Sequence, residues 1–170
     1  DLQTLTIHDC IDITSTTISQ IIQQNSNIIS FSVNNNGCNL AELSRLMVDH
    51  CLLTNLSTNG VRFERHVKDG NYKILVFMLL TENPKKLNDP LNMIPILGYN
   101  LRSWFQQTMN VEENILNDEF LFQLASSCPN FESLRVFQNT FTNKGVTEFV
   151  SKCTQLVEFT VGAVSHFDVN

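Results

Sequence analysis

Long apolar runs are missing from this sequence. The longest, Ile74 to Leu80, is seven residues, whereas a helix that spans a membrane needs about 20. The chain also does not open with a basic segment followed by an apolar one, as a secretory signal does. These two absences predict a protein that does not enter a membrane.

Basic residues are few and scattered. The chain has 11 Lys and Arg against 17 Asp and Glu, which gives a formal net charge of -6. A surface that binds nucleic acid needs Lys and Arg gathered in a patch or stripe to neutralise phosphates. We therefore expect no nucleic-acid partner.

The sequence also lacks the cysteine spacing of a disulfide framework or zinc site and the glycine-rich loop of a phosphate site. The five cysteines are an odd number without a CxxC pair, which argues against both a disulfide framework and a zinc site. The six glycines are isolated, so no glycine-rich phosphate loop is formed. We expect no cofactor, and a reducing compartment, the cytoplasm or nucleus, is the simplest setting for free thiols.

A helix followed by a strand occurs twice between Ile115 and Val161, 25 residues apart. Apolar spacing of three or four predicts each helix, and an LxxLxL step that ends in alternation predicts each strand. The first copy contains Phe120, Leu124, Ala125, Cys128, Phe131, Leu134 and Val136, and the second contains Val146, Phe149, Val150, Cys153, Leu156, Phe159 and Val161. A unit of 25 residues cannot bury its apolar face alone, so neighbouring units must stack. Leu134 and Phe159 are then expected to be fully buried.

The same step recurs from the start of the chain. LxxLxL-like strands begin at residues 2, 28, 53, 72, 101, 131 and 156, which gives about seven repeats in one domain covering 1–170. The first helix is expected around Ile18 to Ile22 and the second around Leu43 to Met47. Because we find no polar capping segment at either end, we expect a fragment of a longer protein.

The repeat is irregular between residues 59 and 100. Val61 to Gly70 is short, charged and bounded by glycines, and Thr81 to Pro90 is polar with two prolines, so both are predicted to be loops. Pro95 weakens the helical pattern from Leu91 to Leu97. The fifth strand, which begins at Leu101, departs from the pattern at its last core position, Gln106.

The pattern resembles leucine-rich repeats of the cysteine-containing kind, as in F-box substrate adaptors and related mitotic-exit regulators. The residues that carry the resemblance are Cys128-Pro129-Asn130-Phe131 and Cys153-Thr154-Gln155-Leu156, each between a helix and an LxxLxL strand. The resemblance implies an α/β fold, a leucine-rich-repeat solenoid with a curved parallel sheet inside and helices outside. No F-box sequence is visible, so contact with a ligase scaffold would depend on regions outside this segment.

Thiol and imidazole groups occur together in His8-Asp9-Cys10 and His50-Cys51, which could serve nucleophilic catalysis or a metal. We favour a structural reading, in which Cys10, Cys51, Cys128 and Cys153 are small buried residues at repeat positions and His8 is exposed. Carboxylates at Glu112-Glu113 and Asp118-Glu119 fall at a helix start, where they favour the helix dipole. We expect neither a catalytic nor a metal site.

Strand alternation places the residues between the core leucines on the opposite, concave face. On the first three strands these residues are small and polar. On the fourth to sixth strands they form a predicted protein-binding patch: Ile74, Val76, Met78, Phe105, Arg135 and Phe137. Aromatic residues, Met and Arg are enriched in protein interfaces. In the alternative, the fourth strand is in another register or is covered by Thr81 to Pro90.

Three functions fit these features. The first is protein recognition, most similar to the substrate-binding repeats of an F-box ubiquitin-ligase adaptor. The second is an enzyme regulator in the manner of leucine-rich GTPase activators, acting through Arg135 as the only Arg on the predicted face. The third is a structural spacer. None of them makes the chain itself an enzyme.

Overall fold

The computed structural model describes residues 2–8, 12–33, 39–58, 61–68, 72–79, 90–106, 116–137 and 139–162, with the backbone alone at residues 40, 67–68, 72–79 and 90. Within these ranges the fold is mixed α/β. Its elements are β1 (Thr4–Ile7), α1 (Ser15–Gln24), β2 (Ser30–Val33), α2 (Leu40–Asp49), β3 (Asn55–Thr58), β4 (Val61–Lys68), β5 (Tyr72–Leu79), η2 (Pro90–Asn92), α3 (Ile94–Leu97), η3 (Gly98–Asn100), β6 (Leu101–Gln106), α4 (Asp118–Ser127), β7 (Ser133–Phe137), α5 (Asn143–Lys152) and β8 (Glu158–Gly162).

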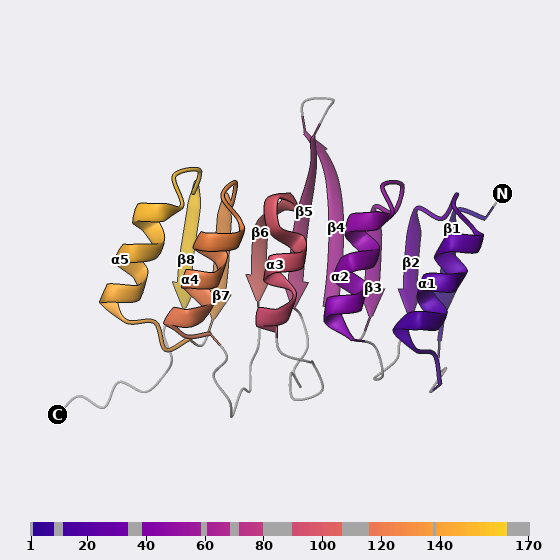
Figure 1. The fold of residues 1–170 in the computed structure, drawn as a ribbon, viewed down its shortest axis with the longest axis horizontal. Helices are drawn as coiled ribbons and strands as arrows, with labels where there is room; N and C mark the ends of the chain where they lie inside the picture. Colours follow the sequence, from indigo (N-terminus) through magenta and orange to yellow (C-terminus); the bar gives the residue numbers. More distant parts are fainter. Residues whose placement is uncertain are drawn as a thin grey trace.

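The strands form one sheet in the order in which they occur in the chain, β1 to β8. Pairing is parallel from β1 to β3 and from β5 to β8, and antiparallel where β4 joins β3 and β5. Helices connect the parallel strands and lie on one side of the sheet (Figure 1). A parallel connection requires such a crossover, whereas the antiparallel β4 does not.

Each ten-residue helix begins at a side chain that accepts a hydrogen bond from the first turn. Thr14 caps α1, Asn39 caps α2, Asn117 caps α4 and Thr142 caps α5. Helices of this length are marginal in isolation. Caps and burial against the sheet therefore stabilise them together.

The turn from helix to strand has the same hydrogen bonds in four places. The C-cap residue donates its N–H to a carbonyl four residues earlier and accepts, through its own carbonyl, from the N–H three residues later. The C-cap residues are Asn25, His50, Cys128 and Cys153. The turn thus leads each helix into the next strand by the same path.

The core lies between the sheet and the helices. One row of facing positions crosses all eight strands: Leu5, Phe31, Leu56, Phe63, Phe77, Trp104, Leu134 and Phe159. Trp104 is fully buried and its ring meets Phe120 of α4 edge-on, with centroids 5.0 Å apart. Leu134 is fully buried as predicted. Phe159 is only half-buried, which corrects the expectation, because on one side of β8 the described residues include no further strand.

The predicted loop from Val61 to Gly70 is wrong, because Val61–Lys68 forms strand β4. Its side chains alternate, with Val61 and Phe63 fully buried and Arg62 and His66 exposed. Of the charged residues that suggested a loop, Arg62 and His66 lie on the exposed face of this strand, whereas Arg65 donates to carbonyls at the end of α2. The sheet is consequently not parallel throughout. The predicted loop from Thr81 to Pro90 lies outside the described residues except for Pro90.

Pro95 restricts the helix between β5 and β6. Only Ile94–Leu97 is α-helical, with a 3-10 turn on each side. At the end of β6, the polar Gln106 is buried, and its Oε1 accepts a hydrogen bond from Nε1 of Trp104 at 3.3 Å. The side-chain oxygen of this buried polar residue therefore has a hydrogen-bond partner within the core.

The cysteines follow the prediction only in part. Cys128 and Cys153 are buried, as expected, but Cys51 is exposed. His50 is the C-cap residue equivalent to Cys128, so Cys51 lies one position further, in the turn. Cys10 and Cys38 lie outside the described residues. In the part of the chain that the structure describes, no helix is both long and apolar enough to cross a membrane.

Candidate functional site

The candidate site is the side of the sheet that faces away from the helices, which we call the helix-distal face. Two rows of facing positions cross it from β1 to β8. The first row is Thr4, Ser30, Asn55, Glu64, Val76, Ser103, Ser133 and Glu158. The second row is Thr6, Ser32, Ser57, Arg62, Met78, Phe105, Arg135 and Thr160.

The first three strands present small, uncharged polar side chains in both rows. These are Thr4, Thr6, Ser30, Ser32, Asn55 and Ser57. The described side chains of this part of the face offer hydroxyl and amide groups. It agrees with the expected character of the first three strands.

Strand β4 brings charge into the middle of the face. Glu64 accepts from Nη1 of Arg62 at 3.3 Å through one oxygen and lies 3.1 Å from Nε2 of His66 through the other. Exposed pairs of this kind contribute little stability. They do place a second arginine on this face, which corrects the expectation that Arg135 is the only one.

An aromatic pair lies on β6 and β7. The rings of Phe105 and Phe137 meet edge-to-face, with centroids 6.5 Å apart and planes at 80°. Phe137 keeps 38% of its surface exposed although it is apolar. Its ring lies over Gly162 of β8, where an added Cβ would collide with it. The absence of a side chain at Gly162 thus allows the ring to lie against the neighbouring strand.

Arg135 lies beside this pair and is held by β8. Its Nε donates to Oε1 of Glu158 at 2.6 Å, and Oε2 of Glu158 accepts from Oγ of Ser133 at 2.9 Å. These hydrogen bonds lower the pKa of the Glu158 carboxyl, Arg135 being the larger cause, and the bond to Glu158 raises the pKa of Arg135. Both groups are charged at neutral pH, and the guanidinium is anchored to Glu158 through Nε.

The predicted site residues meet different outcomes. Phe105 and Phe137 are in contact, and Arg135 faces Phe105 in the strand register. Val76 and Met78 occupy β5 positions facing Ser103 and Phe105. Ile74 faces His66 of β4. The side chains of Ile74, Val76 and Met78 are not described. Sequence reasoning missed Arg62, Glu64 and His66, although the alternation along Val61–Lys68 would have revealed them.

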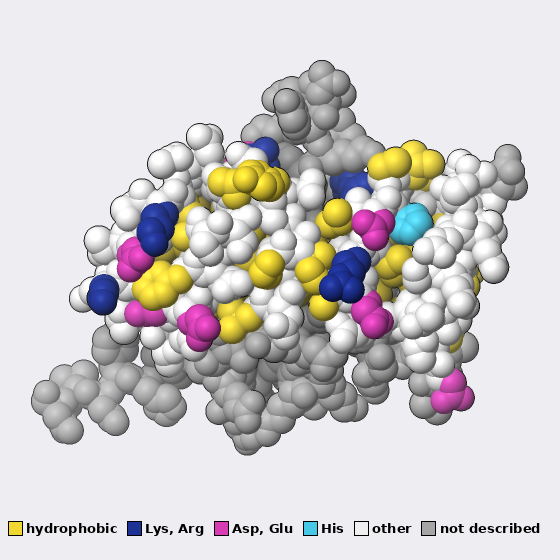
Figure 2. Space-filling model, viewed as in Figure 1, with side chains coloured by type: hydrophobic (Ala, Val, Ile, Leu, Met, Phe, Trp, Pro, Cys, Tyr) yellow, Lys and Arg dark blue, Asp and Glu magenta, His cyan; other side chains and the backbone are white. Residues whose placement is uncertain are grey.

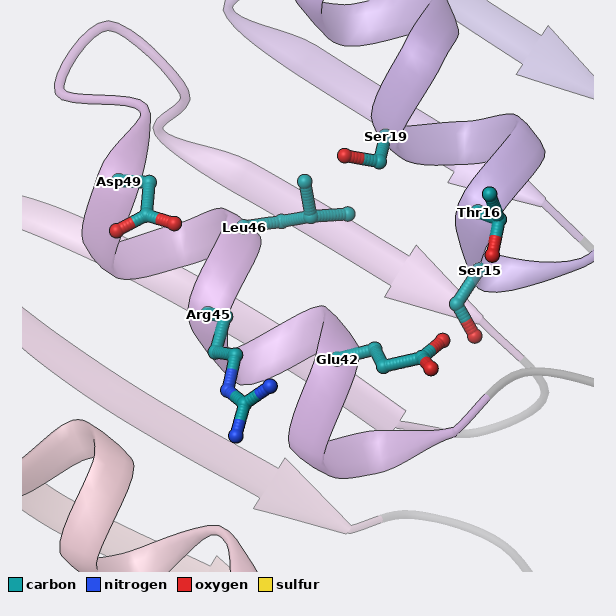
Figure 3. A pocket seen from close by; sticks show the side chains of 7 residues that line it. All are labelled: Ser15, Thr16, Ser19, Glu42, Arg45, Leu46 and Asp49. Carbon is teal, nitrogen blue, oxygen red and sulfur yellow. The ribbon is translucent and has the colours of Figure 1, made fainter.

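The helix side of the molecule has a different surface. Acidic, basic and apolar side chains are interspersed there (Figure 2). A hollow of about 240 Å³ lies between α1 and α2, lined by Ser15, Thr16, Ser19, Glu42, Arg45, Leu46 and Asp49. Leu46 and Glu42 extend across it toward α1 (Figure 3). Glu42 and Asp49 are two turns apart, about 10 Å along the helix, which is too far for a shared acid–base role.

Of the thiol and imidazole groups singled out in the sequence, the structure describes His8, His50 and Cys51. His8 and Cys51 are both exposed, and Cys10 is not described. No group of three or more His, Cys, Asp or Glu side chains within the described ranges could hold a metal ion. Asp118 and Glu119 lie in the first turn of α4, as predicted, while Glu112 and Glu113 lie outside the described residues.

The sequence matches no protein-family model, and comparison with curated proteins finds no match. The residues of the helix-distal face therefore provide the basis for inferring function.

Proposed function

We propose that the chain is a protein-recognition module, a leucine-rich-repeat solenoid whose helix-distal face is the concave binding surface. Single features would not support a repeat, but several recur together. Four helix-to-strand turns share one hydrogen-bond pattern. Consecutive parallel strands pair at offsets of 26 residues between Thr4 and Ser30 and of 25 between Ser133 and Glu158.

A hydrogen bond between the beginnings of neighbouring helices, which we call the helix-start tie, also recurs. Ser15, the first residue of α1, accepts at its hydroxyl from the N–H of Asn39, the N-cap of α2, at 2.8 Å. Asp118, the first residue of α4, accepts in the same way from the N–H of Thr142, the N-cap of α5, at 2.8 Å. Equivalent positions that make equivalent bonds are what stacked copies of one unit require.

The observation that carries the binding role is the exposed ring of Phe137, in contact with the partly buried Phe105 and beside Arg135. Exposed aromatic side chains with a neighbouring Arg are typical of binding hot spots. Charged pairs flank this centre, Arg62 with Glu64 on β4 and Arg135 with Glu158 at β7 and β8. An apolar centre with a polar rim is the ordinary anatomy of a protein interface.

Within this class, the resemblance to F-box adaptors supports a substrate-binding role in a ubiquitin ligase of the cytoplasm or nucleus. The ligase scaffold would then bind regions outside this segment. The alternative, regulation of a GTPase by an inserted arginine, is less supported because Arg135 is bound to Glu158 at 2.6 Å. A structural spacer would not need an exposed aromatic ring such as that of Phe137 on this face.

A capture experiment tests the proposal. Immobilised wild-type chain and the variants Phe137→Ala and Tyr99→Ala are incubated with cell extract, and captured proteins are compared by mass spectrometry. Tyr99 is a matched control because it is 74% exposed and lies in η3, outside the two rows of the face. We expect Phe137→Ala to lose the partner and Tyr99→Ala to keep it. Equal capture by both variants would place the binding surface elsewhere.

With the partner purified, calorimetric titration measures how much each side chain contributes to the binding free energy. Arg135→Ala and Phe137→Ala should each weaken binding by more than about 2 kcal/mol if they are hot spots. Ser30→Ala and Ser32→Ala, on the uncharged part of the face, should change the affinity little. Similar losses for all four variants would contradict a hot spot at β7.

A further inference from the structure

We propose that the site around Arg135 recognises a polypeptide segment in which a carboxylate side chain, Asp or Glu, accompanies an aromatic or aliphatic one. The inference rests on the proposed function and adds the chemistry of the partner. The carboxylate would bind the terminal nitrogens of Arg135, and the apolar side chain would pack on Phe105 and Phe137.

Among the described residues, only one edge of the Arg135 guanidinium has a hydrogen-bond partner. Nε donates to Glu158, and the structure records no further partner for this side chain among the described residues. The side chain is 52% exposed. Toward the described part of the chain, the two terminal nitrogens therefore have N–H groups that can donate, in the fork geometry that matches a carboxylate.

The ion pair with Glu158 orients Arg135 before a partner binds. Glu158 is itself held by Ser133 at 2.9 Å, so the guanidinium has a fixed support on the sheet. An arginine that is fixed before binding loses less side-chain entropy when the complex forms. A bond to a charged acceptor would then contribute more than the same bond from a mobile surface arginine.

The charge of Glu158 favours a carboxylate over a phosphate as the group that binds Arg135. Glu158 is negatively charged and lies directly beside Arg135. A phosphate carries close to two negative charges at neutral pH, so it would be repelled by Glu158 more strongly than a single carboxylate would. The rings of Phe105 and Phe137 also favour a neighbouring apolar group over a fully hydrated one.

A peptide selection tests this inference on the chain as it exists. A phage library of random twelve-residue peptides is selected in parallel on the wild type and on Arg135→Gln. The wild type should enrich peptides with Asp or Glu near an aromatic or aliphatic residue. Arg135→Gln should keep the apolar preference and lose the acidic one, because the guanidinium is removed and the rings are not.

One enriched peptide is then synthesised with Glu, Gln or phosphoserine at the acidic position. On the wild type, Glu to Gln should weaken binding about tenfold, the effect of one charge-assisted hydrogen bond. On Arg135→Gln the two peptides should bind equally, as a double-mutant cycle requires for a direct contact. Phosphoserine should bind the wild type more weakly than Glu, and Glu158→Gln should narrow that difference.

The outcomes separate this inference from the proposed function. Peptides without an acidic preference that still need Phe137 would overturn the inference and leave a binding face in place. Peptides indifferent to both Phe137→Ala and Arg135→Gln, or a selection that enriches nothing, would count against both. Tighter binding of phosphoserine than of Glu would overturn the choice of a carboxylate.

Discussion

Asp118 and Thr142 join the beginnings of two neighbouring helices through two hydrogen bonds. The carboxylate of Asp118 accepts from the backbone N–H of Thr142 at 2.8 Å and from its hydroxyl at 2.6 Å. Thr142 in turn caps α5 by accepting from the N–H of Gly145 at 3.1 Å. The Asp118 carboxylate therefore orients the residue that begins the next helix.

Removal of this carboxylate should loosen α5. Asp118→Ala leaves Thr142 without its partner, so we expect a lower urea midpoint and faster hydrogen exchange in the first turn of α5. Glu119→Ala is the matched control, because it removes the same charge from the same helix turn at an exposed position. If both variants lower the midpoint equally, the loss comes from the interaction of the charge with the α4 helix dipole and not from the hydrogen bonds between Asp118 and Thr142.

Gly145→Ala should disturb the same hydrogen bonds between Asp118 and Thr142, from a position within α5. An added Cβ at Gly145 would collide with the Asp118 carboxylate, which two hydrogen bonds hold in place. We expect a lower melting temperature, although alanine normally favours a helix over glycine. A stabilised Gly145→Ala protein would show that the carboxylate moves at little cost.

Acid should weaken the fold through Asp118 and Glu158. Hydrogen bonds from Thr142 lower the pKa of Asp118, and those from Arg135 and Ser133 lower the pKa of Glu158. The unfolded chain binds protons first as the pH falls below the ordinary carboxyl range of about 4, so stability decreases from there down through the folded-state values. Urea midpoints measured from neutral to acidic pH should fall less steeply in Asp118→Ala than in the wild type. An unchanged slope would contradict the assignment.

Replacement of Leu134 tests the packing of the core. Leu134 is fully buried in the core row on β7, between Trp104 and Phe159, and Leu134→Ala should destabilise the fold by about 2 to 5 kcal/mol through the cavity that it leaves. Phe159→Ala should cost less than a fully buried Phe would, because Phe159 is half-buried. Val157→Ala is the control, since Val157 is 86% exposed and should change the unfolding free energy by less than about 0.5 kcal/mol.

Arg65 should stabilise the end of α2. On the helix side of β4, its guanidinium donates to the carbonyl of His50 at 2.9 Å and to that of Met47. A cation favours a helix C-terminus, and loss of hydrogen bonds from a charged group costs about 1.5 to 3 kcal/mol. Arg65→Gln should show a loss of this order in urea unfolding, and Arg45→Gln, on the exposed surface of α2, should not.

The thiols should differ in reactivity. Burial raises the pKa of Cys128 to about 12 and that of Cys153 to about 11, whereas Cys51 is exposed. Because the thiolate is the reactive form, iodoacetamide at pH 8 should label Cys51 first among these three, as peptide mass spectrometry would show. In urea the three rates should converge. Rapid labelling of Cys128 in the native protein would contradict its place in the core.

Sequence periodicity predicted much of this molecule. The helices around Ile18, Leu43, Leu124 and Phe149 and the strands that follow them lie where apolar spacing placed them. Alternation also placed Phe105, Arg135 and Phe137 on one face. These features depend on contacts within one element or between neighbouring elements, so a local pattern of apolar residues is enough to determine them.

Tertiary structure decided that β4 is a strand and which side chains lie beside each other. These features depend on partners far apart in the chain. Val61–Lys68 is a strand because β3 and β5 pair with it on both edges, and its charged alternate residues hid this in the sequence. The pairing of Arg135 with Glu158 arises from the register of β7 against β8 across 23 residues. Phe137 can cover Gly162 for the same reason. Periodicity determines which face a side chain occupies, but only strand register determines which side chain lies beside it.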